Sequence, residues 1–298
     1  MNILFMESSL YMKIVYVISK TDNYISLNEL LKSKFKVSSR LLFKLIHMQS
    51  IKINGSKCDT RKMYHAGSVL EINFDYEEAS ENIVPTKMDL NILYEDDWML
   101  IVNKPSDIPI HPSMAHFTDS LCNGVKYYFE SIGLKKKVRP VNRLDLYTSG
   151  IVIFAKCEYI QECLIRQMKT SDFKKSYLAL AHGVFENIDG IINKPIARRP
   201  DSIIERCIDF ESGKPSITHY RVLKSFDNYS LILCVLKTGR THQIRVHLNS
   251  IGHPLIGDSL YFKADDKFDG QALHCYRLKF NHPITNENLI FKIFPSWF

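Results

Sequence analysis

A polar turn presents the first residues that could carry out chemistry. It reads Arg143-Leu144-Asp145-Leu146-Tyr147-Thr148-Ser149-Gly150 and runs into the apolar segment 151–155. A turn that enters a strand presents its side chains from a rigid base, and the positive charge of Arg143 is expected to keep Asp145 ionised and oriented. An Asp before a turn is also a common cap for backbone amides, so this turn alone leaves both interpretations open.

Two further polar motifs interrupt the apolar pattern later in the chain. The first is Lys175-Ser176-Tyr177-Leu178-Ala179, in which Tyr177 and Ala179 share one strand face and Lys175 can reach the same side. The second spans residues 236–247 and contains Arg240, His242 and Arg245. Taken singly, Tyr177 is typical of a half-buried strand aromatic and Arg245 of an exposed helix residue. Their joint order with Asp145 favours one site built from three parts of the chain.

The sequence carries no pattern typical of a metal site, so we expect no metal and no cofactor. The seven cysteines are odd in number and never spaced as Cys-x-x-Cys, which argues against a disulfide framework and a zinc site and favours a reducing cytoplasm. His111 and His116, like His242 and His247, are five residues apart, a spacing that does not put two rings on one helix face. The apolar stretch 1–17 is interrupted by charges, and we expect a cytoplasmic protein with no membrane partner.

Positive charge is concentrated near the start of the chain. Residues 26–74 contain nine basic and three acidic side chains, which is six of the net seven positive charges of the whole protein. A small unit with this charge attracts a polyanion, although solvated surface lysines are the common alternative. The expected RNA contacts in this unit are Arg40, Lys44, Lys52, Lys57, Arg61 and Lys62.

The elements of this basic unit can be predicted from caps and periodicity. Ser26 and Glu29 have the spacing of a capping box, and Ser38 or Ser39 can cap a second helix. The period then changes to two at residues 51–53, before the turn Asn54-Gly55, and again at 70–74. We therefore expect a small α/β RNA-binding domain over 13–76, after an N-terminal extension of uncertain role over 1–12.

The remainder is expected to form one large domain over 88–298, after a polar linker over 77–87. Apolar runs at 90–94 and 98–102 predict a hairpin, and further strands are expected at 151–155, 177–181 and 229–236. Helical spacing recurs over 158–169 and 243–248. Several strands with few intervening helices favour an α+β fold, in which a mixed, mostly antiparallel sheet with flanking helices forms the catalytic domain.

The three motifs in this order resemble the RluA-type family of RNA pseudouridine synthases, the group that includes RluA, RluC and RluD. Further segments in the family's order are 101–112, 213–222, 252–258 and 272–283, so the resemblance spans nearly the whole chain from about residue 20. The unit before residue 77 is similar to the RNA-binding module named after ribosomal protein S-four. That resemblance implies docking on structured RNA through phosphates and shape.

The resemblance implies an isomerase that turns specific uridines into pseudouridine by base flipping, with Asp145 as the only catalytic carboxylate, acting as nucleophile or base. It implies that Tyr177 lies against the target base, that Arg245 pairs with the carboxylate, and that Arg143 supports Asp145 and contacts phosphate. It further implies RNA contacts by Lys175, Arg240 and His242, and a pocket wall that includes Leu255. Water must be excluded so that the detached uracil is not lost.

The sequence departs from the family pattern at a few positions, which leaves the substrate open. Asn142 stands where many members have His, Leu146-Tyr147 replaces a commonly charged pair, and Ser106-Asp107 occupies a place where small residues are usual. We expect a monomer acting on ribosomal RNA of the large subunit. The alternatives are a synthase for tRNA and a non-catalytic RNA-binding or ribosome-assembly factor on the same fold.

Overall fold

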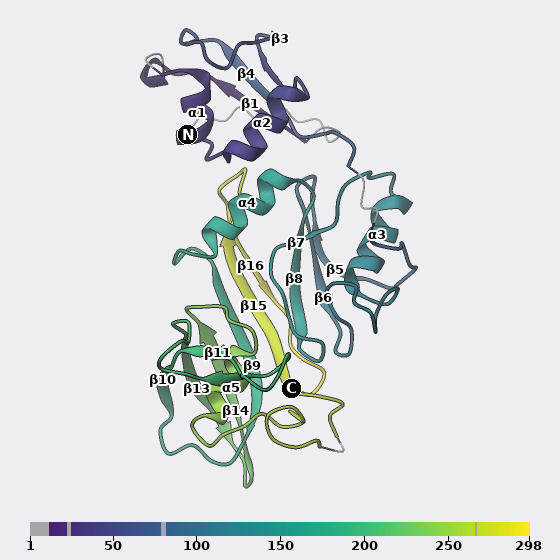
Figure 1. Ribbon diagram of the computed structural model, residues 1–298, viewed down its shortest axis with the longest axis vertical. Helices are drawn as coiled ribbons and strands as arrows, with labels where there is room; N and C mark the ends of the chain where they lie inside the picture. Colours follow the sequence, from purple (N-terminus) through teal and green to yellow (C-terminus); the bar gives the residue numbers. More distant parts are fainter. Residues whose placement is uncertain (1–11, 23–24, 79–81, 266) are drawn as a thin grey trace.

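The computed structural model describes residues 12–22, 25–78, 82–265 and 267–298 (Figure 1). All but the last residue of the predicted extension 1–12 lies outside these ranges, as do residues 79–81 of the predicted linker. The helices are α1 (Leu27–Ser33), α2 (Ser39–His47), α3 (Leu121–Ser131), α4 (Glu158–Gln167) and α5 (Gln243–Asn249), with a short 3-10 turn, η1 (Lys20–Asp22). The strands are β1 (Lys13–Val17), β2 (Ile51–Ile53), β3 (Ser56–Lys57), β4 (Val69–Asn73), β5 (Asn91–Glu95), β6 (Met99–Lys104), β7 (Arg139–Pro140), β8 (Ser149–Ala155), β9 (Lys174–His182), β10 (Asp189–Asn193), β11 (Ile196–Arg198), β12 (Arg206–Ile208), β13 (Ile217–Ser225), β14 (Tyr229–Leu236), β15 (Leu273–Asn281) and β16 (Asn288–Lys292).

The N-terminal unit contains a four-stranded antiparallel sheet in the order β1-β4-β2-β3, packed against α1 and α2. The predicted capping box is present, because the Ser26 hydroxyl accepts from the Glu29 amide and the Glu29 carboxylate accepts from the Ser26 amide. Ser38 caps α2 by accepting from the Leu41 amide. Both helices bury leucines against alternating residues of the sheet. The spacing of apolar residues in the sequence therefore predicted these helices and strands correctly.

A ten-stranded mixed sheet forms the large part of the molecule, with β10-β13-β14-β9-β15-β8-β6-β5 along its main path. Among the described strands, β8 and β15 make its parallel pair and the other pairs are antiparallel, which confirms the predicted α+β class with a mostly antiparallel sheet. The expected hairpin and the strands β8, β9 and β14 are present, as are α4 and α5. The sequence did not predict α3, β10, β13, β15 or β16.

Gly150 permits the contact that joins the two halves of this sheet. It pairs with Cys275 of β15 and has a φ of 112°, a left-handed value that favours glycine. A Cβ at this position would overlap the backbone of Cys275. The end of the Asp145 turn therefore lies directly beside β15, which separates β8 from β9.

The N-terminal unit rests on α4 of the large part (Figure 1). The fully buried ring of Phe74 stacks on Tyr159 at 5.0 Å, and the Tyr159 hydroxyl donates to the carbonyl oxygen of Phe35 at 3.1 Å. The Ser38 hydroxyl also donates to Glu162 at 2.6 Å. Apolar stacking and hydrogen bonds together fix the position of the basic unit on the sheet domain.

Lys44 takes part in this junction, where its charge is already paired within the protein, and its expected RNA contact stays a prediction. Its ammonium lies 2.7 Å from Glu78 and 3.6 Å from Glu158, and 4.4 Å from the centre of the Tyr76 ring. Burial alone raises the pKa of Glu78, but hydrogen bonds from Arg139 and Lys44 outweigh burial and lower it. Glu78 lies in the segment predicted as a plain linker, and it is instead a buried anion that ties the two units together.

Candidate active site

The turn that carries Asp145 is held from beneath by Lys104. The Lys104 ammonium is fully buried at the end of β6 and donates to the carbonyl oxygens of Leu146 at 2.8 Å and Ile108 at 2.7 Å. Burial lowers the pKa of Lys104 to about 7, and the negative charge of Asp145 opposes that shift. The backbone of the turn is thereby fixed while the Asp145 side chain stays free to face a pocket. Lys104 lies in the segment 101–112 that the family resemblance includes, but its support of the Asp145 turn was not predicted from the sequence.

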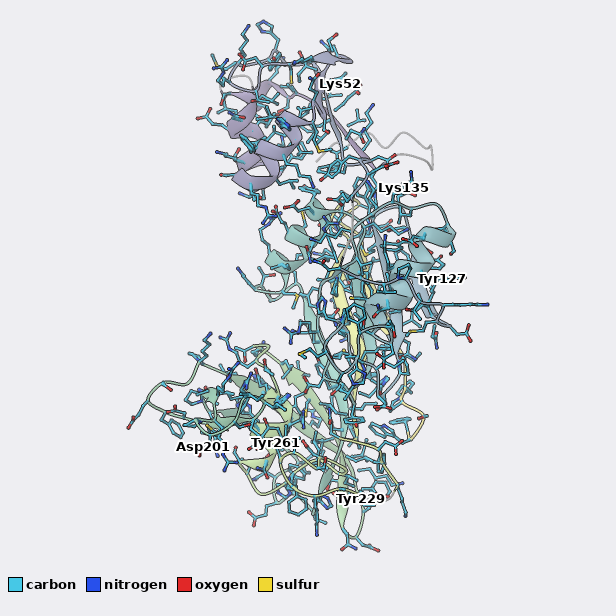
Figure 2. The ribbon with its side chains drawn as sticks, turned by 45° about the vertical axis from the view of Figure 1, so that its right-hand side comes forward. Lys52, Tyr127, Lys135, Asp201, Tyr229 and Tyr261 are labelled. Carbon is cyan, nitrogen blue, oxygen red and sulfur yellow. The ribbon has the colours of Figure 1, made fainter. Side chains whose placement is uncertain are left out.

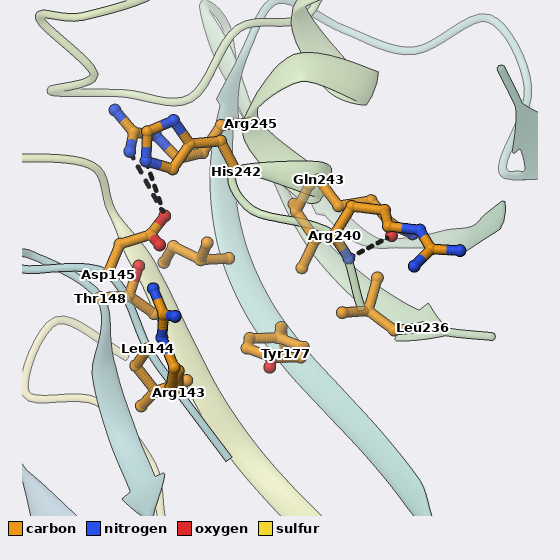
Figure 3. Close-up of a pocket in the computed structure, with 12 residues that line it drawn as sticks. Arg143, Leu144, Asp145, Thr148, Tyr177, Leu236, Arg240, His242, Gln243 and Arg245 are labelled. Carbon is orange, nitrogen blue, oxygen red and sulfur yellow. Dashed lines mark hydrogen bonds and ion pairs between the residues drawn. The ribbon is translucent and has the colours of Figure 1, made fainter. Parts of the chain in front are cut away.

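Arg245 of α5 is the guanidinium beside Asp145 (Figure 3). Its Nη1 lies 3.3 Å from Asp145 Oδ2, and its Nε and Nη2 donate to the two oxygens of Asp258 at 2.8 and 2.7 Å. Arg245 and Asp258 are both buried, at 6% and 1% exposure. A bidentate carboxylate fixes the plane of a guanidinium, so Asp258 sets the direction in which Arg245 reaches Asp145.

Arg143 does not contact Asp145, although the two residues are close in sequence. Its side chain is exposed, and within the described ranges no hydrogen bond or ion pair joins it to Asp145. The structure shows no direct contact through which Arg143 would orient Asp145, so that role stays a prediction. Arg143 still lines the same pocket, where its charge can meet a phosphate.

His242 is the second side chain next to Asp145. Its Nε2 lies 3.8 Å from Asp145 Oδ2, and its Nδ1 lies 2.7 Å from the hydroxyl oxygen of Tyr261. That hydroxyl accepts from the Arg206 amide at 2.8 Å, so its own proton can go to Nδ1, which leaves the remaining imidazole proton on Nε2 facing Asp145. Burial lowers the pKa of His242, which favours this neutral ring. The backbone of His242 is left-handed, with a φ of 57°.

Tyr177 of β9 faces the same pocket from across β15. It is buried, and burial raises the pKa of its phenol well above the usual value, with a smaller contribution from Cys275. At neutral pH the ring is therefore uncharged. Lys175 lies two residues earlier, and burial lowers the pKa of its amine.

The structure brings six of the predicted site residues into one pocket: Arg143, Asp145, Tyr177, Arg240, His242 and Arg245. Two others lie elsewhere. Lys175 lines a neighbouring cavity beneath Gly239, and Leu255 is fully buried in a bridge to Ala181, away from the lining of this pocket. Leu273 and Leu236 supply apolar wall instead. The sequence also missed Asp258 and Tyr261, although Asp258 closes a segment that the family resemblance had singled out.

The departures from the family pattern have structural explanations. Asn142 is buried, donates to the Ile151 carbonyl at 2.9 Å and accepts from the Ile153 amide at 2.9 Å, so it holds β8 and does not face the pocket. The Tyr147 ring packs against Gly270, and Asp107 takes a φ of 61°, a conformation that glycine adopts easily.

Neither a metal cluster nor a membrane span is found in the part of the chain that the structure describes. No group of three or more His, Cys, Asp and Glu side chains could hold a metal ion there. None of the described helices is long and apolar enough to cross a bilayer.

Comparison with known proteins adds the following findings. Residues 98–250 match the family model described as RNA pseudouridylate synthase. The RNA pseudouridine synthase YjbO of Bacillus subtilis is 37% identical over 241 residues, which cover 81% of this chain and 85% of that protein. The ribosomal large subunit pseudouridine synthase D of Pasteurella multocida is 33% identical over 257 residues, covering 81% and 78%. The solved structure titled human RNA Pseudouridylate Synthase Domain Containing 1 aligns with a TM-score of 0.59 and 28% identity, covering 75% of this chain and 88% of that one.

Proposed function

The chain belongs to the RNA pseudouridine synthase family and is an RluA-type enzyme of that family, and we propose that it isomerises specific uridines of large-subunit ribosomal RNA with Asp145 as its catalytic carboxylate. The observation that carries the assignment of Asp145 is its partnership with Arg245. A pocket carboxylate beside a guanidinium that a second carboxylate already orients is arranged before substrate arrives.

The reaction conserves all atoms of the nucleotide. The bond between N1 of uracil and C1′ of ribose breaks, the base turns, a bond forms between C5 and C1′, and the proton on C5 is replaced by one on N1. Asp145 serves this sequence either by attacking C1′ or by removing a proton, and both courses need the ionised carboxylate that Arg245 stabilises. Both also need the detached base to stay enclosed.

The neighbouring groups supply different functions. Tyr177 offers an uncharged ring to pack on the flipped base, and its raised pKa argues against a phenolate base, although its hydroxyl can relay a proton. His242 offers an Nε2 proton next to Asp145 and can donate a hydrogen bond to the carboxylate or to a base oxygen. Arg143 contributes charge at the rim of the pocket.

The choice of ribosomal RNA rests on the relatives, since the one from Pasteurella multocida is named for the large ribosomal subunit. The N-terminal unit supports an RNA substrate, because Lys52, Lys57 and Lys62 are exposed and have no ion pair among the described residues. We assign this unit, over 13–76, to RNA docking in the manner of the S-four module, and the sheet domain over 88–298 to the chemistry. A substrate in tRNA is the second outcome that the experiment below separates.

We expect Asp145→Asn to abolish pseudouridine formation while RNA affinity changes less than twofold. The amide keeps the shape of the side chain but cannot act as nucleophile or base. The measurement is chemical mapping of pseudouridine in total stable RNA from cells with and without the protein, followed by the same assay with purified variants. The map also decides between ribosomal RNA and tRNA.

Asp97→Asn is the matched control, because Asp97 is exposed in the turn between β5 and β6, away from the pocket. It should form pseudouridine at the wild-type rate. Full turnover by Asp145→Asn would show that another residue carries the reaction.

A further inference from the structure

A second cavity lies next to the catalytic pocket and shares Arg240 with it. This cavity, the β11–β12 cleft, has a volume of about 580 Å³ and is lined by both strands of the small β11–β12 hairpin together with residues 212–214 and 239–241. Its size falls in the range of sites that bind small molecules or parts of larger ones. It therefore offers space for a ligand that continues outward from the pocket.

The charged side chains of the cleft are all positive. Arg198, Arg206, Lys214 and Arg240 line it, with the hydroxyls of Ser212 and Thr241, and no carboxylate is among the lining residues. Outside residues 26–74 the chain has a net charge of only one, so four cations with no acid are a local concentration. A cavity of this composition is selective for anions.

None of these four cations has an ion pair within the described part of the chain. The Arg206 guanidinium donates to the carbonyl oxygens of Ile204 and Glu205, and the Arg240 Nε donates to that of Pro215. Two carboxylates close in sequence are engaged elsewhere, because Glu205 pairs with Arg199 at 2.6 Å and Asp209 accepts from Ser212. The four cations of the cleft therefore stay unpaired among the described residues, although carboxylates lie close to them in sequence.

The fold forces two of these cations together. Arg198 and Arg206 are direct partners across the antiparallel β11–β12 pair. Like charges opposite each other in a sheet are destabilising by a few tenths to about 1 kcal/mol. The backbone bridge between Ile196 and Lys214 brings a third positive charge to the same hairpin. An anion lying between them removes this repulsion.

The cleft adjoins the Asp145 pocket at Arg240, which lines both. In Figure 3 the guanidinium of Arg240 points away from Asp145, while its backbone is fixed beside Gln243 at the start of α5. The Arg206 amide donates to Tyr261, which in turn holds His242. One strand thus contributes both to the cleft and to the orientation of a side chain next to Asp145.

We propose that the β11–β12 cleft binds the backbone phosphates of RNA nucleotides that flank the target uridine. The inference rests on the proposed function of the Asp145 pocket and adds to it the position of the substrate strand. The nucleoside enters the pocket, and the adjoining phosphates lie along Arg240, Lys214, Arg198 and Arg206. Because backbone contacts carry no sequence information, the cleft sets the register of the strand and does not read its bases.

The test removes charge from the cleft and leaves the pocket intact. In the full-length protein, the double variant Arg198→Ala/Lys214→Ala should raise KM for a large-subunit ribosomal RNA transcript roughly tenfold with kcat unchanged. The plot of log affinity against log salt concentration should become shallower by about 1.5 to 2 for the two lost phosphate contacts. Lys214→Arg should behave as wild type, because charge and reach are retained.

Lys224→Ala is the matched control. Lys224 is also exposed, on β13, but lines no part of the cleft, and its removal should change the salt slope only slightly. Equal effects of Lys224→Ala and the double variant, or an unchanged slope in both, would overturn the proposal. Arg198→Ala should also melt no earlier than wild type, since it relieves the cross-strand repulsion; a large loss of stability would assign Arg198 to folding instead.

The proposal for the cleft and the proposed function can be tested separately, because the first predicts RNA binding and the second predicts pseudouridine formation. Binding can be measured in the Asp145→Asn background, where the salt slope still reports on the cleft even if no pseudouridine forms. A wild-type protein that binds RNA with the expected slope but modifies no uridine would contradict the catalytic assignment alone.

Discussion

The catalytic pocket and the β11–β12 cleft are neighbours that treat charge in opposite ways. In the pocket, Asp145 is matched by Arg245, and Arg245 is held by Asp258. In the cleft, four cations have no counter-ion among the described residues. The difference teaches that internal pairing fixes the geometry of the Asp145 pocket, whereas the cleft keeps the unpaired charge that the proposed phosphate binding requires.

The N-terminal unit contains the same contrast on a smaller scale. Lys44 forms ion pairs with Glu78 and Glu158 at the junction with α4. Lys52 and Lys57 are instead exposed and face each other across the β2–β3 pair, another like-charged partnership (Figure 2 labels Lys52, at the opposite end of the molecule from Tyr261). Exposure and pairing, more than position in a basic stretch, distinguish the two kinds of lysine.

The largest effect is expected from Asp258→Asn, which breaks the pairing that defines the pocket. It removes the negative charge that pairs with the buried Arg245 and one of the two hydrogen bonds between them, and removal of one partner of a buried pair destabilises by about 3–5 kcal/mol. We expect a fall in kcat of at least tenfold with little change in KM, and a lower melting temperature. Steady-state kinetics and thermal unfolding are the measurements.

Asp189→Asn provides the control for Asp258→Asn, because Asp189 pairs with Arg221 at 3.8 Å on the surface, where both side chains are about two-thirds exposed. Exposed pairs contribute little, so kinetics and melting should match wild type. If Asp258→Asn also left kinetics and melting temperature unchanged, the ion pair with Asp258 would not be what orients Arg245.

A smaller effect is expected from the lysines of the N-terminal unit. Lys52→Ala/Lys57→Ala should weaken binding to a ribosomal RNA transcript roughly tenfold and make the salt dependence shallower, because both charges are free to meet phosphates. Lys44→Ala should leave the salt dependence nearly unchanged and lower the melting temperature, because its charge is used within the protein. Filter binding at several salt concentrations and thermal unfolding separate the two outcomes. A reversed pattern would mean that the junction opens when RNA binds.

The smallest effect concerns an uncharged group at the join of β8 and β15. His274 Nε2 donates to the Ile293 carbonyl oxygen at 2.9 Å, so in the neutral ring Nδ1 accepts from the Ser149 hydroxyl at 2.8 Å, and burial lowers the pKa of His274 to about 4. Because its folded pKa lies below its unfolded value of 6.5, the unfolded state takes up more protons between these values, and stability falls as the pH falls. From pH 7.5 to pH 6 the loss from this group is roughly 1 kcal/mol.

Urea unfolding at pH 7.5 and pH 6 measures this loss. His274→Asn, which cannot take up a proton in this range, should be less stable than wild type at pH 7.5 but should lose less stability on acidification. Parallel acid dependence in both proteins would show that other groups determine it.

Much of the site was predictable because its motifs lie on regular elements. Asp145 precedes a strongly apolar strand, Tyr177 lies within one, and Arg245 follows a helix start, so the order of motifs and the family resemblance brought them together. The pairing of Arg245 with Asp258 and the support of Asp145 by Lys104 were not predictable, because both depend on contacts between distant segments. The β11–β12 cleft was not predicted as a site, because Arg198 and Arg206 lie in no motif and Lys214 and Arg240 lie in two different ones.

Local sequence also misled in two instructive places. Arg143 is two residues from Asp145 in the chain and lines the same pocket, but no hydrogen bond or ion pair joins the two among the described residues. Asn142 differs from the family pattern at a place that suggested substrate contact, yet its amide satisfies two backbone groups of β8. The side chain of a polar residue near a candidate site can be used by the backbone that carries the site, as that of Asn142 is.

The position of β15 has a consequence for the order of events during synthesis. β8 and β9 emerge from the ribosome well before β15, yet β15 lies between them in the sheet and supplies Leu273 to the pocket. Asp145 and Tyr177 therefore remain on unconnected halves until residues 273–275 are available to join them at Gly150. The nascent chain can dock its basic unit on α4 once α4 has formed, but the pocket is complete only after residues 273–275 have been synthesised.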